Sequence, residues 1–226
     1  MALTRANVKA KQVRCLGNLR QHGIALAMFL GEKNSYPLFL NLAQRFPDHG
    51  YSLWDALSTR GLGPFPTDLR APNSVYFCPA FIEQLKADSR LDNLGAIYGY
   101  NVDGLNGGGT NLPLGLGLSW NAGSQSYNPV NESQIVAPSR MLAMGDGVTG
   151  WNNTYQDSAG LARQSWAQDH VGSTGRVTRR HGGKLNVLFC DGHVTGESLQ
   201  FLFRDTSEPA LSSWNRDNQP HAERVK

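Results

Sequence analysis

The sequence predicts an α+β protein, in which one long N-terminal helix precedes a loop-rich head containing short β-strands. Two patterns in the 226 residues support this prediction. No proline occurs before Pro37, and apolar or small residues recur in steps of three and four from Leu3 to Leu30, which is the period of one helix face. Late in the chain, Asp191-Gly192 separates two β-prone runs, and this dipeptide is a strong hairpin signal.

The predicted helix has two unlike halves. Residues 1–33 hold six basic residues and one acidic residue, a net charge of +5 in a chain whose net charge is +3. The segment from Ile24 to Leu30 is apolar nearly all round, which is typical of a buried helix. We therefore expect residues 1–33 to form a stalk whose second half packs on the head, residues 34–226. An ordinary basic surface helix and a helix lying on a membrane surface are the alternatives.

The head is expected to be built from short elements. Ser52 and the three residues after it have the pattern of a capping box, and Gly61 and Gly63 then end the short helix that it begins. After Phe203 the pattern weakens, which predicts an extended C-terminal tail on the surface. The other expected elements are strands at 74–78, 94–100, 135–136, 140–145 and 184–190, helices at 80–88 and 159–168, and a loop rich in Gly, Asn and Ser at 101–131.

Composition excludes several classes of protein. Charged residues are only 17% of the chain, against about 25% in ordinary soluble domains, which suits an exported protein or one that packs against its own copies. The small net charge does not indicate a nucleic-acid partner. No apolar run approaches the ~18 residues of a membrane span, and no signal peptide is present, so we expect this chain by itself to be soluble. Three cysteines are too few for a disulfide-dense scaffold or a four-cysteine zinc site.

Several segments, in order along the chain, carry a resemblance to one family. In the last of them, His181 stands nine residues before Asp191-Gly192. The segments are 12–30, Phe77-Cys78-Pro79, Tyr98-Gly99-Tyr100-Asn101, 138–143, 180–194 and the ending 214–221. With them the chain resembles the bacterial prepilin-like proteins recognised by a processing-associated His-x9-Asp-Gly motif.

The resemblance implies a pilin-like fold, in which the second half of a long N-terminal helix packs on an antiparallel β-sheet. It implies a non-enzymatic pseudopilin-like subunit of a type II secretion or type IV pilus-like assembly, with other pilin-like subunits or the secretion machinery as partners. Members of the family begin with a basic leader, a cleavage and methylation site, and an apolar membrane helix of about twenty residues. We expect Met1 to be a new start placed after these parts. The full-length protein would then be exported and anchored in the inner membrane, with a periplasmic or extracellular head.

A second class of function is a membrane-anchored binding module that captures polysaccharide or secreted cargo through the 101–131 loop. Aromatic rings stack on sugars and anchor interfaces, although packing inside the head is their default role. The aromatic residues concerned are Tyr98, Tyr100, Trp120, Tyr127, Trp151, Tyr155 and Trp166. A metal-dependent hydrolase is the weakest class, because no nucleophile–base pair or set of three ligands is evident.

The two ends of the His-x9-Asp-Gly motif are expected to lie far apart. A strand over 185–190 spans roughly 20 Å, which separates His181 from Asp191 unless Gly182 and Gly183 fold the chain back. We expect Asp191 and Gly192 to form a two-residue turn, and His181 to hydrogen-bond the backbone. The alternative is a calcium or zinc site made by Asp191 and His193 with Asp146; otherwise no cofactor is expected.

The three cysteines fall into two kinds. Cys15 lies on the long helix and Cys78 precedes Pro79, and in an oxidising compartment such a pair joins. We expect a Cys15–Cys78 disulfide, with three free thiols as the alternative. Cys190 sits in an apolar strand and is expected to be a small buried side chain.

Overall fold

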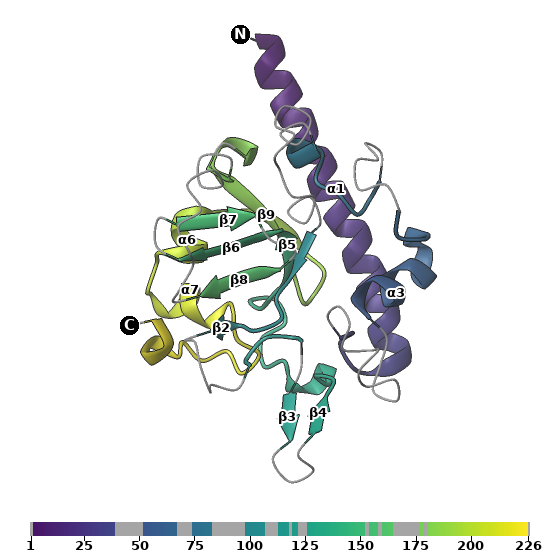
Figure 1. Ribbon diagram of the computed structural model, residues 1–226, viewed down its shortest axis with the longest axis vertical. Helices are drawn as coiled ribbons and strands as arrows, with labels where there is room; N and C mark the ends of the chain where they lie inside the picture. Colours follow the sequence, from purple (N-terminus) through teal and green to yellow (C-terminus); the bar gives the residue numbers. More distant parts are fainter. Residues whose placement is uncertain are drawn as a thin grey trace.

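The computed structural model describes residues 2–38, 52–66, 74–82, 98–106, 113–117, 119–121, 126–151, 154–157, 160–164, 177–178 and 180–225. Helix α1 (Ala2–Lys33) is continuous over 32 residues, and its N-terminal end projects from a head that contains the strands (Figure 1). This arrangement confirms the α+β class and the uninterrupted helix. Within the described residues, no helix is long and apolar enough to cross a membrane.

Two four-stranded sheets form the body of the head. The first is antiparallel throughout, whereas the second is mixed because β8 is parallel to both β2 and β6. The first sheet has the order β1 (Tyr98–Tyr100), β5 (Leu142–Asp146), β9 (Lys184–Phe189), β10 (Val194–Ser198). The second has the order β2 (Leu105–Asn106), β8 (Leu161–Gln164), β6 (Val148–Trp151), β7 (Thr154–Asp157), and β3 (Ser119–Asn121) and β4 (Ser126–Asn128) form a separate hairpin.

The two sheets meet where β1 passes residue 160. Tyr100 forms an isolated parallel bridge with Gly160. A Cβ atom on Gly99 would lie 2.3 Å from the carbonyl carbon of Gly160, a distance that real Cβ contacts do not reach. Glycine at position 99 therefore lets the two backbones approach, which joins the antiparallel sheet to the mixed one.

The second half of α1 packs on the first sheet along β9. Its buried face includes Cys15, Leu19 and Leu26, and a Cβ atom on Gly23 would lie only 2.8 Å from Cδ1 of Leu188. The helix therefore lies close to β9 at Gly23, where a larger side chain would push it away from the sheet.

The expectation that the second half of the helix is buried all round is wrong. The side chains of Ile24 and Met28 are 63% and 50% exposed. Helix α1 packs on β9 and β10 and also on α3 (Leu53–Leu57) and η2 (Ser58–Leu62), which lie on the other side of it from the sheet (Figure 1). These contacts leave one face of the helix uncovered, and Ile24 and Met28 lie on that face. The second half of the helix therefore has one buried face and one exposed face, and the exposed face carries apolar side chains that the described part of the head leaves uncovered.

Short elements agree with the sequence prediction at several places, and β1 and β5 overlap the expected strands 94–100 and 140–145. Helix α3 (Leu53–Leu57) begins at Ser52, whose hydroxyl accepts a hydrogen bond from the amide of Asp55. The chain leaves the following segment η2 (Ser58–Leu62) through Gly61 and Gly63, both with positive φ. Strand β9 and the hairpin to β10 also lie where the Asp-Gly signal placed them.

Other local predictions are wrong. Residues 74–78 form a turn and a single bridge before a short helical segment at 79–82. Residues 135–136 follow the 3-10 turn η4 (Glu132–Gln134) and are not a strand, 161–164 is strand β8 rather than helix, and the 101–131 segment contains β2, β3 and β4. The rest of the predicted helix 80–88, the start of the predicted strand 94–100 and Trp166 lie outside the described residues.

The C-terminal segment is not a surface tail. Helices α6 (Leu199–Phe203) and α7 (Glu208–Ser212) and the turn η6 (Ala222–Val225) follow β10. Trp214 is fully buried and packs in a core cluster with β9 side chains. Oδ1 of Asn215 accepts a hydrogen bond from the amide of Leu105, and Nδ2 of Asn101 donates to the carbonyl of Trp214. Hydrogen bonds from side-chain amides hold this segment on the head. The hydropathy pattern of the sequence cannot predict such bonds, which is why it predicts a surface tail instead.

Candidate functional site

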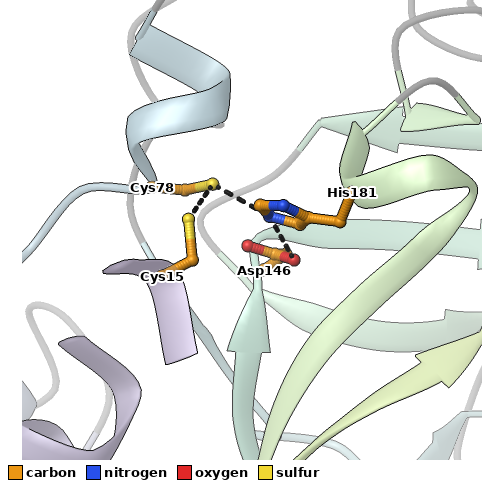
Figure 2. Close-up of side chains that lie close together, drawn as sticks. All are labelled: Cys15, Cys78, Asp146 and His181. Carbon is orange, nitrogen blue, oxygen red and sulfur yellow. Dashed lines mark hydrogen bonds and ion pairs between the residues drawn. The ribbon is translucent and has the colours of Figure 1, made fainter. Parts of the chain in front are cut away.

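Four chemically active side chains meet where the stalk helix joins the head. Cys15 comes from α1, Cys78 precedes the helical segment at 79–82, Asp146 ends β5, and His181 lies in η5 (Arg180–Gly182). All four are buried, and one ligand atom from each lies within 4.8 Å of the other three. Figure 2 shows the four side chains pointing toward one another. We call this group the junction cluster.

Local backbone geometry brings each member into place. The side chain of Asn18, one helical turn after Cys15, donates to the carbonyl of Phe77 and so holds the Cys78 segment against α1. His181 has a φ of 49° and is followed by Gly182 and Gly183 at 74° and 85°. Three consecutive residues in the left-handed region reverse the chain sharply. This reversal turns the His181 side chain inward just before β9 begins.

The distances within the junction cluster form a chain of contacts. Sγ of Cys15 lies 3.0 Å from Sγ of Cys78, and Sγ of Cys78 lies 3.3 Å from Nε2 of His181. The same Nε2 lies 3.3 Å from Oδ2 of Asp146. The amide of Asn186 also donates to Oδ2 of Asp146, at 2.8 Å, so β9 orients the carboxylate. The two sulfurs are not bonded in the structure.

Charge and burial act against each other in this cluster. Burial favours the neutral carboxyl of Asp146, but its contacts with His181, Arg180 and the amide of Asn186 prevail and hold its pKa below the usual value. Burial likewise favours neutral His181, but Asp146 outweighs it and raises the pKa of His181 to about 10. Burial raises the pKa of the Cys78 thiol. At neutral pH the cluster therefore contains neutral thiol at Cys78 beside a buried His181–Asp146 ion pair.

The arrangement differs from a nucleophilic triad in two ways. In a triad the nucleophile and the carboxylate bind opposite nitrogens of the imidazole, whereas Cys78 and Asp146 both contact Nε2 of His181. Nδ1 of His181 is buried without a hydrogen-bond partner. The cluster is also closed to substrate, since every member is buried. Its chemistry suits a structural link or a metal ion better than acyl transfer.

The Asp-Gly end of the motif is an exposed turn. Gly192 has a φ of 91°, as expected, and its amide donates to the carbonyl of Phe189. The amide of Phe189 donates to the carbonyl of His193, so three residues, not the expected two, connect the strands. A three-residue loop with glycine in the last position is the usual form of a turn followed by a bulge. Oδ1 of Asp191 accepts from the amide of His193 at 3.1 Å and lies 2.6 Å from its Nδ1.

The structure does not bring together the predicted ligand set of Asp146, Asp191 and His193. Asp146 contacts Asn186 near the start of β9, whereas Asp191 follows the end of that strand. The five-residue separation along the strand amounts to roughly 17 Å. The expectation that His181 bonds the backbone is also wrong, because its described partners are the side chains of Asp146 and Cys78.

Cys15 and Cys78, the expected disulfide pair, do lie side by side. Sequence reasoning missed that His181 and Asp146 adjoin them. The available signal was the Gly182-Gly183 pair, which allows the chain to turn back, together with a carboxylate at the end of a buried strand. Cys190 lies at the other end of β9 and is partly buried.

Comparison with known proteins adds no identification. No protein-family model matches the chain, and no curated protein or solved structure is significantly similar to it.

Proposed function

We propose that this chain is the stalk and head of a non-enzymatic pseudopilin-like subunit in a type II secretion or type IV pilus-like assembly. The observation that supports this best is α1, which is continuous over 32 residues and packs its second half on an antiparallel sheet. The proposal includes export, an inner-membrane anchor before the stalk, and a head in the periplasm or outside the cell. Other pilin-like subunits or the secretion machinery are the proposed partners.

The outer face of the stalk helix supports assembly through helix packing. Val13, Ile24 and Met28 are 66%, 63% and 50% exposed. At about 100° per residue, these three positions lie within about 60° of one another. They face away from the buried side marked by Cys15, Leu19 and Leu26. Neighbouring helices that covered this apolar stripe would remove it from water.

Basic side chains on the first half of the helix fit a position close to an anionic membrane. Lys9 is exposed, and the segment carries Lys11 and Arg14 as well. Lys and Arg near the surface of an anionic membrane are attracted by about 1 kcal/mol each. In the proposed subunit this part of the stalk lies next to the lipid head groups.

A photo-cross-linking experiment in the native cell tests the proposal. A photoreactive residue replaces Ile24 on the stalk or, as a control matched in exposure, Val136 on the head, which is 67% exposed. We expect Ile24 to cross-link to other copies or other pilin-like helices, and Val136 to give no helix-to-helix product. Cross-links from Val136 but none from Ile24 would contradict assembly through the stalk.

A surface binding module for polysaccharide or secreted cargo is the second candidate. The hairpin of β3 and β4 extends from the head at the end opposite the N-terminus of α1 (Figure 1). Trp120 and Tyr127 are register partners in that hairpin. Screening the purified chain against polysaccharides tests this candidate, and binding lost in Trp120→Ala with unchanged folding would favour it over the pseudopilin.

A further inference from the structure

We propose that the junction cluster, with both thiols reduced, binds one zinc ion through Cys15, Cys78, Asp146 and His181. This site differs from the ligand set suggested by sequence, sharing only Asp146 with it. Assembly is not required for it, because a zinc ion can link stalk and head whether or not the chain assembles. In an oxidising compartment the Cys15–Cys78 disulfide would replace it, so the site is the reduced state of the same thiol pair.

The spacing of the donor atoms fits a four-coordinate ion. Zinc binds thiolate sulfur at about 2.3 Å and imidazole or carboxylate at about 2.0–2.2 Å, which puts tetrahedral ligand atoms about 3.3–3.8 Å apart. The consecutive contacts in the cluster are 3.0, 3.3 and 3.3 Å, and no pair exceeds 4.8 Å. Small side-chain rotations would bring all four atoms to one centre.

The donor types select zinc over the harder cations. Two sulfurs, one imidazole nitrogen and one carboxylate oxygen suit a borderline-soft ion, whereas calcium and magnesium require oxygen ligands throughout. The four residues come from four separate segments of the chain. A metal there would tie the stalk helix to both the 74–82 segment and the sheet, as structural zinc sites do in other small folds.

Two further observations point to a ligand in the cluster. Oδ1 of Asp146 is buried without a hydrogen-bond partner, and a buried carboxylate oxygen without a partner is costly. Coordination through Oδ1 would give this oxygen a partner, while Oδ2 keeps its hydrogen bond from the amide of Asn186. Two thiolates and one carboxylate with Zn²⁺ carry a net charge of −1, which the buried guanidinium of Arg180, whose charge acts on Asp146, offsets.

The binding step balances as an exchange of protons for metal. Zn²⁺ displaces one proton from each thiol and, where His181 is protonated, one from its imidazole, and these protons pass to solvent. No electron is transferred. A disulfide between Cys15 and Cys78 removes both thiolates, so the disulfide and the zinc ion exclude each other at this site.

Cobalt(II) substitution in the reduced, folded chain tests the site. We expect one equivalent of Co²⁺ to give the absorption of a tetrahedral ion with two thiolate-to-cobalt charge-transfer contributions, and one equivalent of Zn²⁺ to displace it. Cys190→Ser and the double variant Asp191→Asn/His193→Ala should bind as the parent does. Cys15→Ser and Cys78→Ser should bind at least 100-fold more weakly, and Asp146→Asn about 10- to 100-fold more weakly.

Several results would overturn the proposal. They are the absence of stoichiometric binding by the reduced chain, a cobalt spectrum without thiolate bands, or binding lost in Asp191→Asn/His193→Ala but kept in Cys15→Ser. Circular dichroism checks that each variant is folded. If the cysteine variants do not fold, the spectrum of the parent chain still decides, because the charge-transfer bands report how many thiolates bind. Chain oxidised with oxidised glutathione should bind no cobalt, and binding by that form would also contradict the site.

Discussion

The two ends of β9 carry the two halves of one sequence motif, and they differ in almost every physical respect. At the start of the strand, His181 is 5% exposed and contacts a carboxylate and a thiol from distant segments. At its end, the side chains of Asp191 and His193 are 36% and 42% exposed and contact each other. The first end connects separate parts of the fold, whereas the second shapes a single turn.

Helix α1 passes both ends. Cys15 lies in the junction cluster, and eight residues later Gly23 lies against Leu188 and Gly192. The motif therefore marks the strand on which the stalk is docked. We infer that the buried end of β9 supplies most of the free energy that holds the stalk on the head, whereas the exposed end mainly sets the geometry of the turn. The following predictions test that contrast.

The largest effect is expected from joining Cys15 to Cys78 in protein made in an oxidising compartment. The bond would link positions 63 residues apart, which stabilises by about 4 kcal/mol in the chain-entropy model. Both thiols are buried, so alkylation is done in denaturant without reductant; mass spectrometry should then find Cys15 and Cys78 unmodified and Cys190 labelled. Urea unfolding with and without reductant gives the stability difference. Labelling of both residues in the denatured, unreduced protein would refute the bond.

Removing the buried carboxylate should cost nearly as much. Asp146→Asn leaves the positive charges of His181 and Arg180 without their buried partner, and breaking such a pair costs about 3–5 kcal/mol. We expect the low end, about 3 kcal/mol, because asparagine keeps an acceptor for the amide of Asn186. The matched control Asp191→Asn, at the exposed end, should change the unfolding free energy by less than about 0.5 kcal/mol. Equal losses would remove the contrast between the ends.

Acidic pH should destabilise the fold through His22, which lies on α1 between Cys15 and Gly23. This side chain is buried on α1 and its Nε2 contacts the carbonyl of Val75 at 3.1 Å; burial lowers its pKa to about 4. Between pH 6.5 and 4 the imidazole of His22 is protonated in the unfolded chain but not in the folded chain. The free energy of unfolding therefore decreases by about 3 kcal/mol as the pH is lowered from 6.5 to 4. Asp146, with its lowered pKa, loses its contribution only at more acidic pH.

His22→Gln separates this effect from other titrations. Glutamine can donate to Val75 and does not titrate, so the slope of unfolding free energy against pH should flatten between pH 6.5 and 4. A slope unchanged from the parent chain would show that another group causes the acid loss.

The smallest measurable change in unfolding free energy is expected at the turn that contains Gly192. Gly192 has a φ of 91°, and a β-branched residue there is strained, so Gly192→Val should cost about 2 kcal/mol. Gly192→Asn should cost less, because asparagine tolerates positive φ better. Neither variant should alter the reactivity of Cys15 and Cys78. Thermal unfolding ranks the variants, and a larger loss in Gly192→Asn than in Gly192→Val would argue against strain as the cause.

Local patterns in the sequence predicted some parts of the fold well. The stripe from Leu3 to Leu30 is a helix and Asp191-Gly192 is a hairpin turn, because both signals depend on neighbouring residues. Hydropathy could not show that Ile24 faces outward, since that depends on which elements cover the helix. It also missed the buried segment around Trp214, which is held by side-chain amides from Asn101 and Asn215.

The candidate site was only partly accessible to sequence reasoning. Cys15 and Cys78 were paired from their chemistry, and the separation of His181 from Asp191 followed from strand length. The addition of Asp146 and His181 to the thiols depends on the reversal at Gly182-Gly183 and on the register of β5 with β9. Neither is encoded in a short motif, because both arise from contacts between distant segments.

Hydrogen–deuterium exchange of α1 is the most direct measurement of whether the buried end of β9 fastens the stalk to the head. Amide exchange over residues 15–30 is compared among the parent chain, Asp146→Asn and Asp191→Asn under native conditions. The account predicts exchange at least tenfold faster over this half of α1 in Asp146→Asn and unchanged exchange in Asp191→Asn. Unchanged exchange in folded Asp146→Asn, or equal acceleration in both variants, would contradict it.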